Sequence, residues 1–303
     1  SELWSIFDFL MPGLLGTRES FAKRFESPVE HAEGDSAARL QALVSPFVLR
    51  RVKEDVVADL PEKIEDTVMA QLTGEQRKLY LANQDRIAQQ VQHREASEFK
   101  KDKLKVLAEL TKLRQICCDP RLHYEDYKAG SAKLDTCMEL VHGALDGGHR
   151  ILLFSQFTGM LDIIGKRLAK EDIAFLKLTG ASSKESRAKM VAQFQAGEVP
   201  VFLISLKAGG VGLNLTAADV VIHYDPWWNV AAQDQATDRA HRIGQQHTVT
   251  VYKLIAKDTI EERIMQMQES KRDLVNSVLG GDGISSALFT REDVLALLGG
   301  DGR

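Results

Sequence analysis

With 303 residues, 44% of them hydrophobic and 27% charged, the chain has the composition of an ordinary globular protein and is long enough for two structural units. Its formal net charge of −4 excludes a generally basic nucleic-acid-binding protein, so DNA or RNA would have to meet a local basic surface. No apolar run could cross a bilayer, no signal peptide is visible, and Cys117, Cys118 and Cys137 predict buried thiols rather than a zinc site or a disulfide framework.

Residues 1–130 are expected to be mainly helical. From Thr73 onward, two successive apolar stripes predict a long helical hairpin, which Pro120 closes. Thr73 and Gln76 have the spacing of a capping box at the start of this hairpin. The basic run FKKDKLK inside the hairpin could touch phosphate, but a solvated helix surface accounts for it more simply.

From residue 131 the pattern changes, and short apolar strands alternate with amphipathic helices. This alternation predicts a parallel sheet covered by helices on both faces, an α/β fold. The predicted strands lie within residues 149–156, 174–178, 201–205, 220–224 and 248–255, and the predicted helices cover residues 133–145, 160–170, 184–195 and 230–241. Thr259 and Glu262 form a second predicted capping box ahead of a long helix, and a short helix is expected at 291–298.

In such sheets, ligands bind in the loops beyond the carboxyl ends of the strands. One of these loops is SLKAGGVGLNLT, whose glycines let the backbone turn tightly and expose N–H groups to an anion. Lys207 and Asn214 add a positive charge and an amide to it. A glycine-rich turn is weak evidence by itself, and the chain contains no GxxxxGK[ST] phosphate loop.

Two further segments follow. In DPWWN, adjacent side chains on an extended backbone point to opposite sides. One of Trp227 and Trp228 can therefore belong to the core while the other faces outward. It is equally plausible that both tryptophans are functional. In QATDRAHRIGQ, read as a helix from about residue 229, a small-residue face consists of Ala232, Ala236, Ala240 and Ile243. A polar stripe at i, i+3, i+4 and i+7 consists of Gln235, Asp238, Arg239 and Arg242.

Taken together and in order, these segments resemble the Swi/Snf-type family of helicase-like, DNA-translocating ATPases. The resemblance rests on ELWSIFDFLMPGLLG, PFVLRRVKEDVVADLPEK, ILLFSQFT, SLKAGGVGLNLTAADVVIHYDPWWN, QATDRAHRIGQ and TIEERI. It implies two RecA-like lobes that close on ATP and magnesium and move along duplex DNA. This chain resembles the second lobe, with helical protrusions and a linker at 1–130, the RecA-like lobe (helicase C-terminal domain) at 131–256, and a bracing helix and tail at 257–303.

The resemblance also implies roles for individual residues. Arg239 and Arg242 match arginine fingers that act on the γ-phosphate, Gln235 and Asp238 would connect them to the nucleotide and to the first lobe, and Gly210 lies in a loop that couples nucleotide state to DNA contact. The positions implied to line the DNA backbone are Ser155, Gln156, Thr179, Gly180, Arg187, Lys207, Asn214 and Trp228. No metal ligand is implied in this chain. Val230 and Gln233 depart from the proline and glutamate that are usual in the family.

The implied partners are the backbone of double-stranded DNA and the first lobe of the same protein, in a monomer with no membrane contact. The implied location is the cytoplasm, with nucleoid association in a bacterium, or the nucleus in a eukaryote. We therefore expect half of a DNA-stimulated ATP hydrolase that remodels protein–DNA complexes, inactive as an isolated chain. Two alternatives stay open, a non-hydrolysing DNA- or partner-binding module and a strand-separating helicase.

Overall fold

The computed structural model describes residues 2–26, 36–47, 60–92, 96–209, 213–227, 230–270 and 291–299. The chain forms two compact units, Ser1–Ala58 and Asp59–Arg303. The first unit is helical, as expected, and a small core forms where its helices meet around Phe7, Leu15, Phe21 and Phe25. Its elements are α1 (Glu2–Leu10), α2 (Arg18–Phe21), the π-helical η1 (Ala22–Glu26), α4 (Ser36–Val44) and the 3₁₀ turn η2 (Ser45–Phe47).

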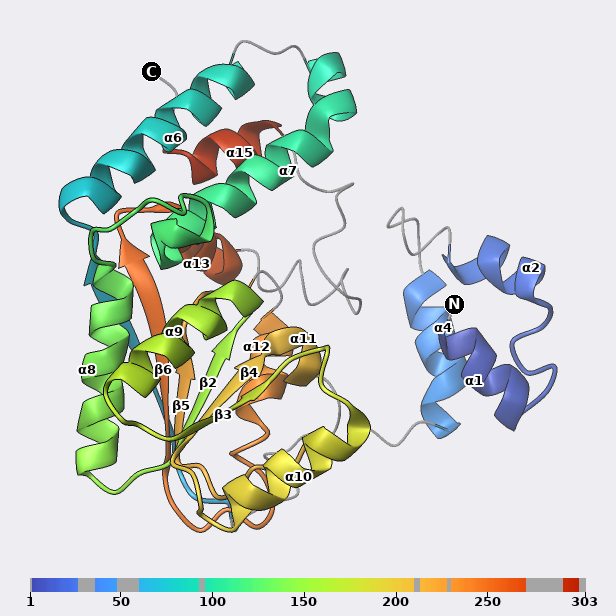
Figure 1. Cartoon of the computed structure of the whole chain (residues 1–303). Coiled ribbons are helices and arrows are strands. Elements are labelled where there is room, and N and C mark those ends of the chain that lie inside the picture. Colours follow the sequence, from blue (N-terminus) through green and yellow to red (C-terminus); the bar gives the residue numbers. More distant parts are fainter. Residues whose placement is uncertain are drawn as a thin grey trace. The chain divides into compact units, whose positions relative to one another are not determined.

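The second unit is organised around a six-stranded sheet in which every neighbouring pair is parallel (Figure 1). The strand order is β1-β6-β5-β2-β4-β3. The strands are β1 (Lys63–Gln71), β2 (Ile151–Ser155), β3 (Phe175–Leu178), β4 (Val201–Ser205), β5 (Val220–His223) and β6 (Val249–Lys257). Every residue of β2, β4 and β5 is buried, which is why these strands read as continuous apolar runs.

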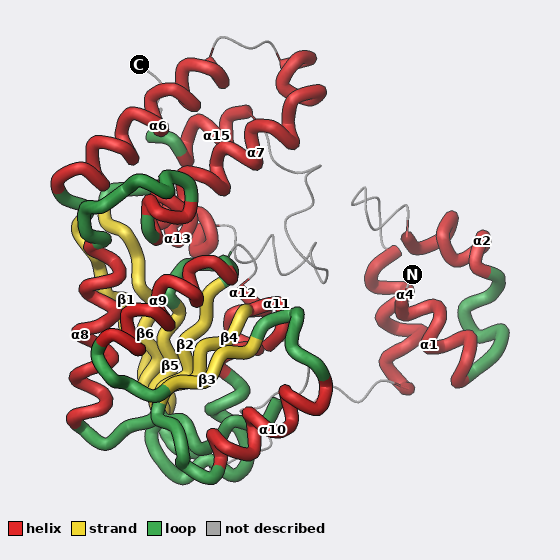
Figure 2. The backbone as a smooth tube through the Cα atoms, in the orientation of Figure 1, coloured by secondary structure: helices red, strands yellow, loops and turns green. Residues whose placement is uncertain are grey.

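Helices cover both faces of this sheet, which confirms the predicted α/β architecture (Figure 2). On one face, α8 (Ala132–Asp146) and α9 (Thr158–Lys170) pack against one set of alternating strand residues, including Leu153 and Leu203. On the other face, α10 (Lys184–Gln195), α11 (Leu206–Gly209) and α12 (Val230–Thr237) pack against the other set, including Phe154 and Ile204. The period of two along each strand produces this division.

The edge strand β1 was not predicted from the sequence. It pairs with β6 over its whole length, from Lys63 opposite Val249 to Gln71 opposite Lys257. Most of its side chains are exposed, so its sequence shows no apolar run, and only pairing with β6 defines it as a strand. Because β1 lies within the segment assigned to helical protrusions, the sheet includes residues from ahead of residue 131.

The predicted hairpin is confirmed as α6 (Gly74–Gln92) and α7 (Ala96–Cys118), followed by the 3₁₀ turn η3 (Pro120–Leu122). Two later helices, α13 (Ile260–Ser270) and α15 (Arg291–Leu297), pack on this hairpin in a second core. Side chains of α6 and α15 cap each other's carboxyl ends: Arg291 Nη2 donates to Gln92 O at 2.8 Å, and Gln84 Nε2, from the middle of α6, donates to Leu298 O at 2.6 Å. The short helix predicted at 291–298 is confirmed as α15, whereas the part of the long predicted helix that continues beyond Ser270 lies outside the described residues.

Gln76 does not form the predicted capping box. It is buried, its Nε2 donates to Ile116 O at 3.0 Å, and its Oε1 accepts from the backbone N–H of Ala132 at 3.1 Å. A buried amide must satisfy all its hydrogen-bonding groups, and here the partners belong to α7 and α8. Gln76 therefore joins the hairpin to the first helix of the sheet instead of capping its own helix.

Candidate functional site

A buried carboxylate connects the carboxyl ends of β2 and β5. Asp225 is 1% exposed and accepts a hydrogen bond from Ser155 Oγ at 2.5 Å. Its other oxygen accepts from Gln156 Nε2 at 2.5 Å and from the backbone N–H of Gln156 at 3.3 Å. Charge-assisted hydrogen bonds of this kind offset the cost of burying a carboxylate. The loops after the two strands are consequently fixed to each other.

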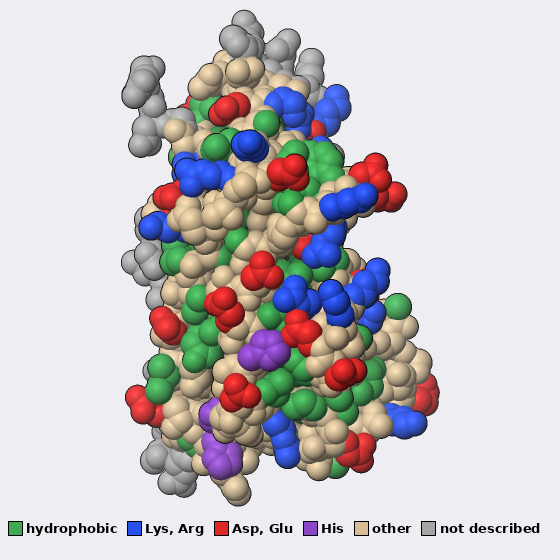
Figure 3. All heavy atoms as spheres, turned by 60° about the vertical axis from the view of Figure 1, so that its left-hand side comes forward, with side chains coloured by type: hydrophobic (Ala, Val, Ile, Leu, Met, Phe, Trp, Pro, Cys, Tyr) green, Lys and Arg blue, Asp and Glu red, His purple; other side chains and the backbone are tan. Residues whose placement is uncertain are grey.

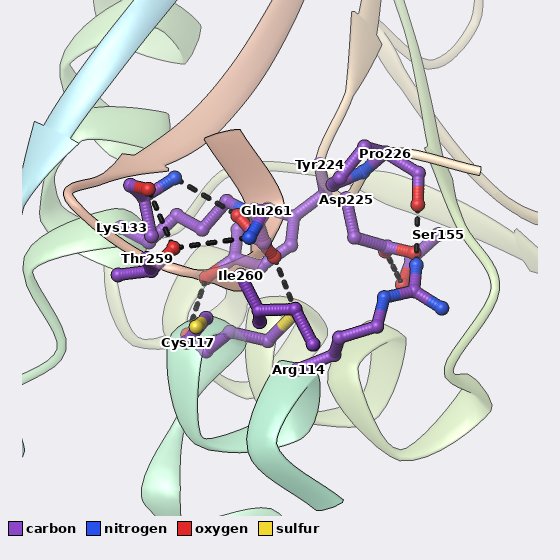
Figure 4. A network of polar contacts seen from close by, with 12 residues as sticks. Arg114, Cys117, Lys133, Ser155, Tyr224, Asp225, Pro226, Thr259, Ile260 and Glu261 are labelled. Carbon is purple, nitrogen blue, oxygen red and sulfur yellow. Dashed lines mark hydrogen bonds and ion pairs between the residues drawn. The ribbon is translucent and has the colours of Figure 1, made fainter. Parts of the chain in front are cut away.

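Arg114 of α7 binds the same two loops from the side of the hairpin. Figure 4 shows its side chain reaching Pro226, with Ser155 and Asp225 nearby. One guanidinium nitrogen donates to Pro226 O, and the other donates to Gln156 Oε1 at 3.1 Å. Arg114 was not predicted from the sequence, although a signal existed: it is a charged residue in the apolar stripe of the hairpin, at helical spacing from Leu110.

A second buried group adjoins this one and includes the helix after the sheet. Lys133 and Glu261 are both fully buried and form an ion pair, with Nζ and Oε2 2.5 Å apart (Figure 4). Burial opposes the charge of Lys133, but Glu261 offsets this effect and raises the pKa of Lys133 above its ordinary value. Tyr224, at the end of β5, donates to Cys118 O at 3.0 Å and places its ring 5.4 Å from the Lys133 ammonium. The hairpin, α8, α13 and β5 therefore meet at one polar centre.

The carboxyl end of the glycine-rich loop is bound to the segment after α12. The backbone N–H of Leu215 donates to Arg239 O at 3.0 Å, and Arg242 Nη1 donates to Leu213 O at 3.4 Å. Gln245 is buried, and its Nε2 donates to three carbonyls, the closest being Ala218 O at 2.7 Å. These contacts make the two segments a single surface.

The prediction of one helical stripe from Gln235 to Arg242 is wrong. The helix α12 ends at Thr237, and the next two turns close through i to i−3 bonds, from Arg239 N to Ala236 O and from Ala240 N to Thr237 O. Beyond this turn the carbonyl of Arg239 accepts from Leu215, and the chain continues to β6. Ala236 and Ala240 are buried as predicted, whereas Ile243 is 73% exposed and does not belong to the packed face.

Arg242 is nevertheless close enough to affect the guanidinium of Arg239. Arg239 is half-buried, and burial together with the positive charge of Arg242 lowers its pKa, an effect that Asp238 partly offsets. Within the described part of the chain, the buried Nε of Arg239 has no hydrogen-bond partner. A buried donor without a partner beside a second guanidinium is a chemically suitable contact for an oxyanion.

Comparisons with known proteins show the family to which the chain belongs. Residues 1–122 match the family model of the SNF2-related domain, and residues 132–244 match that of the helicase conserved C-terminal domain. The structure of the C-terminal domain of a SWI2/SNF2 ATPase from Sulfolobus solfataricus aligns with a TM-score of 0.64 and 32% identity, over 78% of this chain and 98% of that one. The chain belongs to the SWI2/SNF2 family.

Two further relatives define how much of a SWI2/SNF2 protein this chain represents. The ATPase core from Sulfolobus solfataricus in complex with double-stranded DNA is 36% identical, with a TM-score of 0.66, over 97% of this chain and 63% of that one. The putative ATP-dependent helicase/translocase YwqA of Bacillus subtilis is 40% identical, over 96% of this chain and 32% of its own length. The chain thus spans about a third of the length of this curated relative.

In the SWI2/SNF2 fold, the remaining predicted positions fall near the ends of the strands. Gly180 and Asn214 are exposed, Thr179 is half-buried, and Gln235 and Asp238 are exposed on and just after α12. Arg187 of α10 is half-buried and donates to Ala208 O of α11 at 3.4 Å, which brings the loops after β3 and β4 together. Lys207 belongs to α11, but its side chain lies outside the described structure, as do Gly210 and Trp228.

The position of Ser155 does not fit the role that the resemblance implies for it. It was expected to line the path of the DNA backbone, but its side chain is fully buried and its hydroxyl is bonded to Asp225. A hydroxyl that satisfies a buried carboxylate has no free surface to offer a phosphate. In this SWI2/SNF2 lobe, Ser155 fixes the loop that carries Gln156, and Gln156 itself is half-buried with its amide shared between Asp225 and Arg114.

Gln233, one of the two departures from the usual SWI2/SNF2 residues, has a defined structural role. It is buried on α12, and its Oε1 accepts from the backbone N–H of Trp227 at 3.4 Å. The other departure, Val230, is the first residue of α12, which shows that the helix starts there without proline. Gln233 therefore connects the loop after β5 to the helix that leads to Arg239.

The described residues also bear on membranes, metal ions and the distribution of surface charge. Over the described residues, no helix is long and apolar enough to span a membrane, and no group of three His, Cys, Asp or Glu side chains could hold a metal ion. On the face drawn in Figure 3, Lys and Arg side chains are interspersed with Asp and Glu side chains. That face is not a uniformly basic DNA-binding surface.

Proposed function

We propose that this chain is the second lobe of an ATP-dependent double-stranded DNA translocase that remodels protein–DNA complexes. The observation that carries the proposal is the pair Arg239 and Arg242, two half-buried residues that are bonded to the carboxyl end of the glycine-rich loop. Burial and the positive charge of Arg242 lower the pKa of Arg239. An anion placed between them would relieve their repulsion. Membership of a family of ATP-dependent enzymes makes the γ-phosphate of ATP the anion of choice.

The residues present fit a phosphate that is presented from outside the lobe. The accessible parts of the half-buried Arg239 and Arg242 guanidinium groups would contact it, with Gln235 and Asp238 on the exposed side of the same segment. ATP with magnesium, bound mainly by a first lobe, supplies the scissile phosphoanhydride bond. Arginine fingers typically contribute roughly 10³–10⁵ in rate by stabilising the charge that develops in phosphoryl transfer.

For DNA, we propose contacts with the phosphate backbone rather than with bases. Thr179, Gly180, Arg187, Lys207 and Asn214 come from the loops and helices that follow β3 and β4, and the bond from Arg187 to Ala208 O supports their acting as one surface. Such contacts give affinity without sequence readout. A related ATPase core has been solved with double-stranded DNA, which supports a duplex as the substrate.

The chain alone should bind duplex DNA weakly without hydrolysing ATP, because its sequence contains no GxxxxGK[ST] phosphate loop. This proposal is tested by incubating the 303-residue chain with ATP, magnesium and duplex DNA. Salt-sensitive DNA binding with no release of phosphate is expected. Turnover by the isolated chain would contradict it.

The finger assignment is tested in a protein that carries both lobes, where Arg242→Ala and Arg239→Ala should each lower the DNA-stimulated kcat by roughly 10³-fold or more. Arg86→Ala is the matched control, because Arg86 pairs with Glu109 on the hairpin surface, away from the arginine pair. If Arg242→Ala stays within a few-fold of the wild type, the assignment fails. Displacement of a third strand from a triplex, without unwinding of a forked duplex, would distinguish a translocase from a strand-separating helicase.

A further inference from the structure

We infer that Arg114 is a positioning residue that couples the α6–α7 hairpin to the arginine pair through the loops after β2 and β5. The inference rests on the proposed function, since it assigns a role in coupling to a residue that touches neither nucleotide nor the proposed DNA path. Arg114 lies on α7, outside the proposed site. Its buried guanidinium is bonded to the loops after β2 and β5, which belong to the site.

The contacts of Arg114 are specific to a guanidinium. The side chain is 2% exposed, donates to both Gln156 Oε1 and Pro226 O, and lies 5.7 Å from the centre of the Phe157 ring. The planar fork can reach two acceptors on different loops at once, whereas a lysine ammonium is a point charge on a flexible stem. Removing either loop contact would leave a buried charge poorly compensated.

From Pro226 a short series of contacts continues to the arginine pair. The next residue, Trp227, donates its backbone N–H to Gln233 of α12 at 3.4 Å. The Gln233 backbone carbonyl then accepts from Thr237 Oγ1 at 3.3 Å, at the last residue of that helix. Arg239 follows two residues later. A shift of α7 relative to the sheet would therefore displace the start and the end of α12 together.

A purely structural role for Arg114 makes a different prediction. The base of the hairpin is already fixed to the sheet by Gln76, which bonds to both α7 and α8, and by the buried pair of Lys133 and Glu261. If Arg114 only added to this anchoring, its loss would lower the stability of the whole chain and leave the local order of the loop after β5 unchanged. If it positions that loop, the loop should loosen while the hairpin stays folded.

The first test uses tryptophan fluorescence of the 303-residue chain, which contains three tryptophans. In a Trp4→Phe background, only Trp227 and Trp228 remain, directly after Pro226. Arg114→Lys and Arg114→Met should each raise the acrylamide quenching constant about twofold, as expected for a locally opened loop, with unchanged far-ultraviolet circular dichroism. Arg86→Met, a loss of an arginine from the same hairpin, should leave quenching unchanged. Equal quenching in the Arg114 and Arg86 variants would overturn the inference.

A second variant keeps the test decisive if Arg114→Met does not fold. Gln156→Leu removes one acceptor of Arg114 from the loop side and leaves the contact with Pro226 in place.

In a protein with both lobes, Arg114→Lys should lower the DNA-stimulated kcat by on the order of 100-fold, the effect of a misplacement of about 1 Å, with little change in KM for ATP. Combined with Gln156→Leu, its effect should be less than additive. Additive effects, or a kcat equal to that of the Arg86 control, would contradict coupling.

The two proposals fail in different ways. If the wild-type two-lobed protein shows no DNA-stimulated hydrolysis, the proposed function is wrong, and the quenching experiment still decides whether Arg114 orders the loop. If the wild type is active and the Arg114 variants behave like the Arg86 control, only the further inference is wrong.

Discussion

The backbone N–H of Leu215 donates to the carbonyl of Arg239 at 3.0 Å, so the carboxyl end of the glycine-rich loop and the turn that carries the arginine pair share a backbone hydrogen bond. Arg242 returns to the same segment through its side chain, at Leu213 O. Because a backbone bond holds main-chain atoms, any displacement of one segment moves the other. This relationship gives the proposed coupling between DNA contact and nucleotide a physical basis within one lobe.

Gln245 should be essential for the stability of that surface. Its amide donates to Thr216 O, Ala218 O and Ala240 O and accepts from two backbone N–H groups, and it is 6% exposed. Gln245→Leu removes five hydrogen bonds at once and leaves the buried carbonyl of Ala218 without this donor, so we expect a loss of about 2–4 kcal/mol in the free energy of unfolding, measured by urea denaturation. Gln246→Leu, whose side chain is exposed, should change it by less than about 0.5 kcal/mol. Equal effects would contradict this role of Gln245.

Breaking the buried ion pair from one side should be costly. Lys133→Met leaves Glu261 buried without its cation and is expected to reduce the free energy of unfolding by about 3–5 kcal/mol. Adding Glu261→Leu should recover only part of this loss, because Glu261 also accepts from the backbone N–H of Ala256 at 2.8 Å. Chemical denaturation of the two single variants and the double variant measures the coupling. Full recovery in the double variant would show that the bond to Ala256 contributes little.

His223 should make the stability of the chain depend on pH even at pH values above those at which carboxylates take up protons. It is fully buried at the end of β5, where burial, and to a smaller extent Lys253, lowers its pKa to about 3. The unfolded chain takes up a proton below the ordinary pKa of about 6.5 while the folded chain does not, so stability falls as the pH decreases from 6.5 towards 3. The slope from this group approaches about 1.4 kcal/mol per pH unit at the lower end.

Urea denaturation between pH 7 and pH 5 checks this prediction by comparing the wild type with His223→Phe. The variant also loses the contact of 2.8 Å with Thr237 Oγ1, a loss that does not depend on pH over this range. The difference between the two proteins should therefore change with pH, with the wild type losing more stability on acidification. Parallel curves would mean that His223 takes up its proton in the folded chain as well.

Arg187 should contribute to the affinity for DNA but not to sequence preference. Its guanidinium lies beside the loop after β4, on the proposed path of the DNA backbone. For Arg187→Ala we expect weaker binding to all duplexes alike, and a slope of log K against log salt that is smaller by about 0.9, one phosphate contact. Fluorescence anisotropy over a salt series measures both. Arg150→Ala, next to the amino end of β2, is the control that should leave the slope unchanged.

Much of the lobe could be predicted from local sequence. The strand at Val201–Ser205 has the predicted bounds because it is an apolar run between turn residues. The helix at Lys184–Gln195 has the predicted bounds because Ser183 caps its start. Both signals come from residues that are neighbours in the sequence. The predicted order of segments also sufficed to indicate the family. The edge strand β1 could not be found in this way, because its exposed side chains carry no periodic apolar pattern and only β6 makes it a strand.

The sequence by itself determined the α/β class, the helical hairpin and the residue types near the strand ends, because these depend on periodicity and on local backbone preferences. Only the tertiary structure decided that Ser155 is buried against Asp225, that α12 ends at Thr237, and that Arg114 reaches Pro226 across 112 residues of sequence. Each of these depends on which distant partner satisfies a buried polar group. Such a partner is defined by packing in three dimensions, and the spacing of residues along the chain does not specify it.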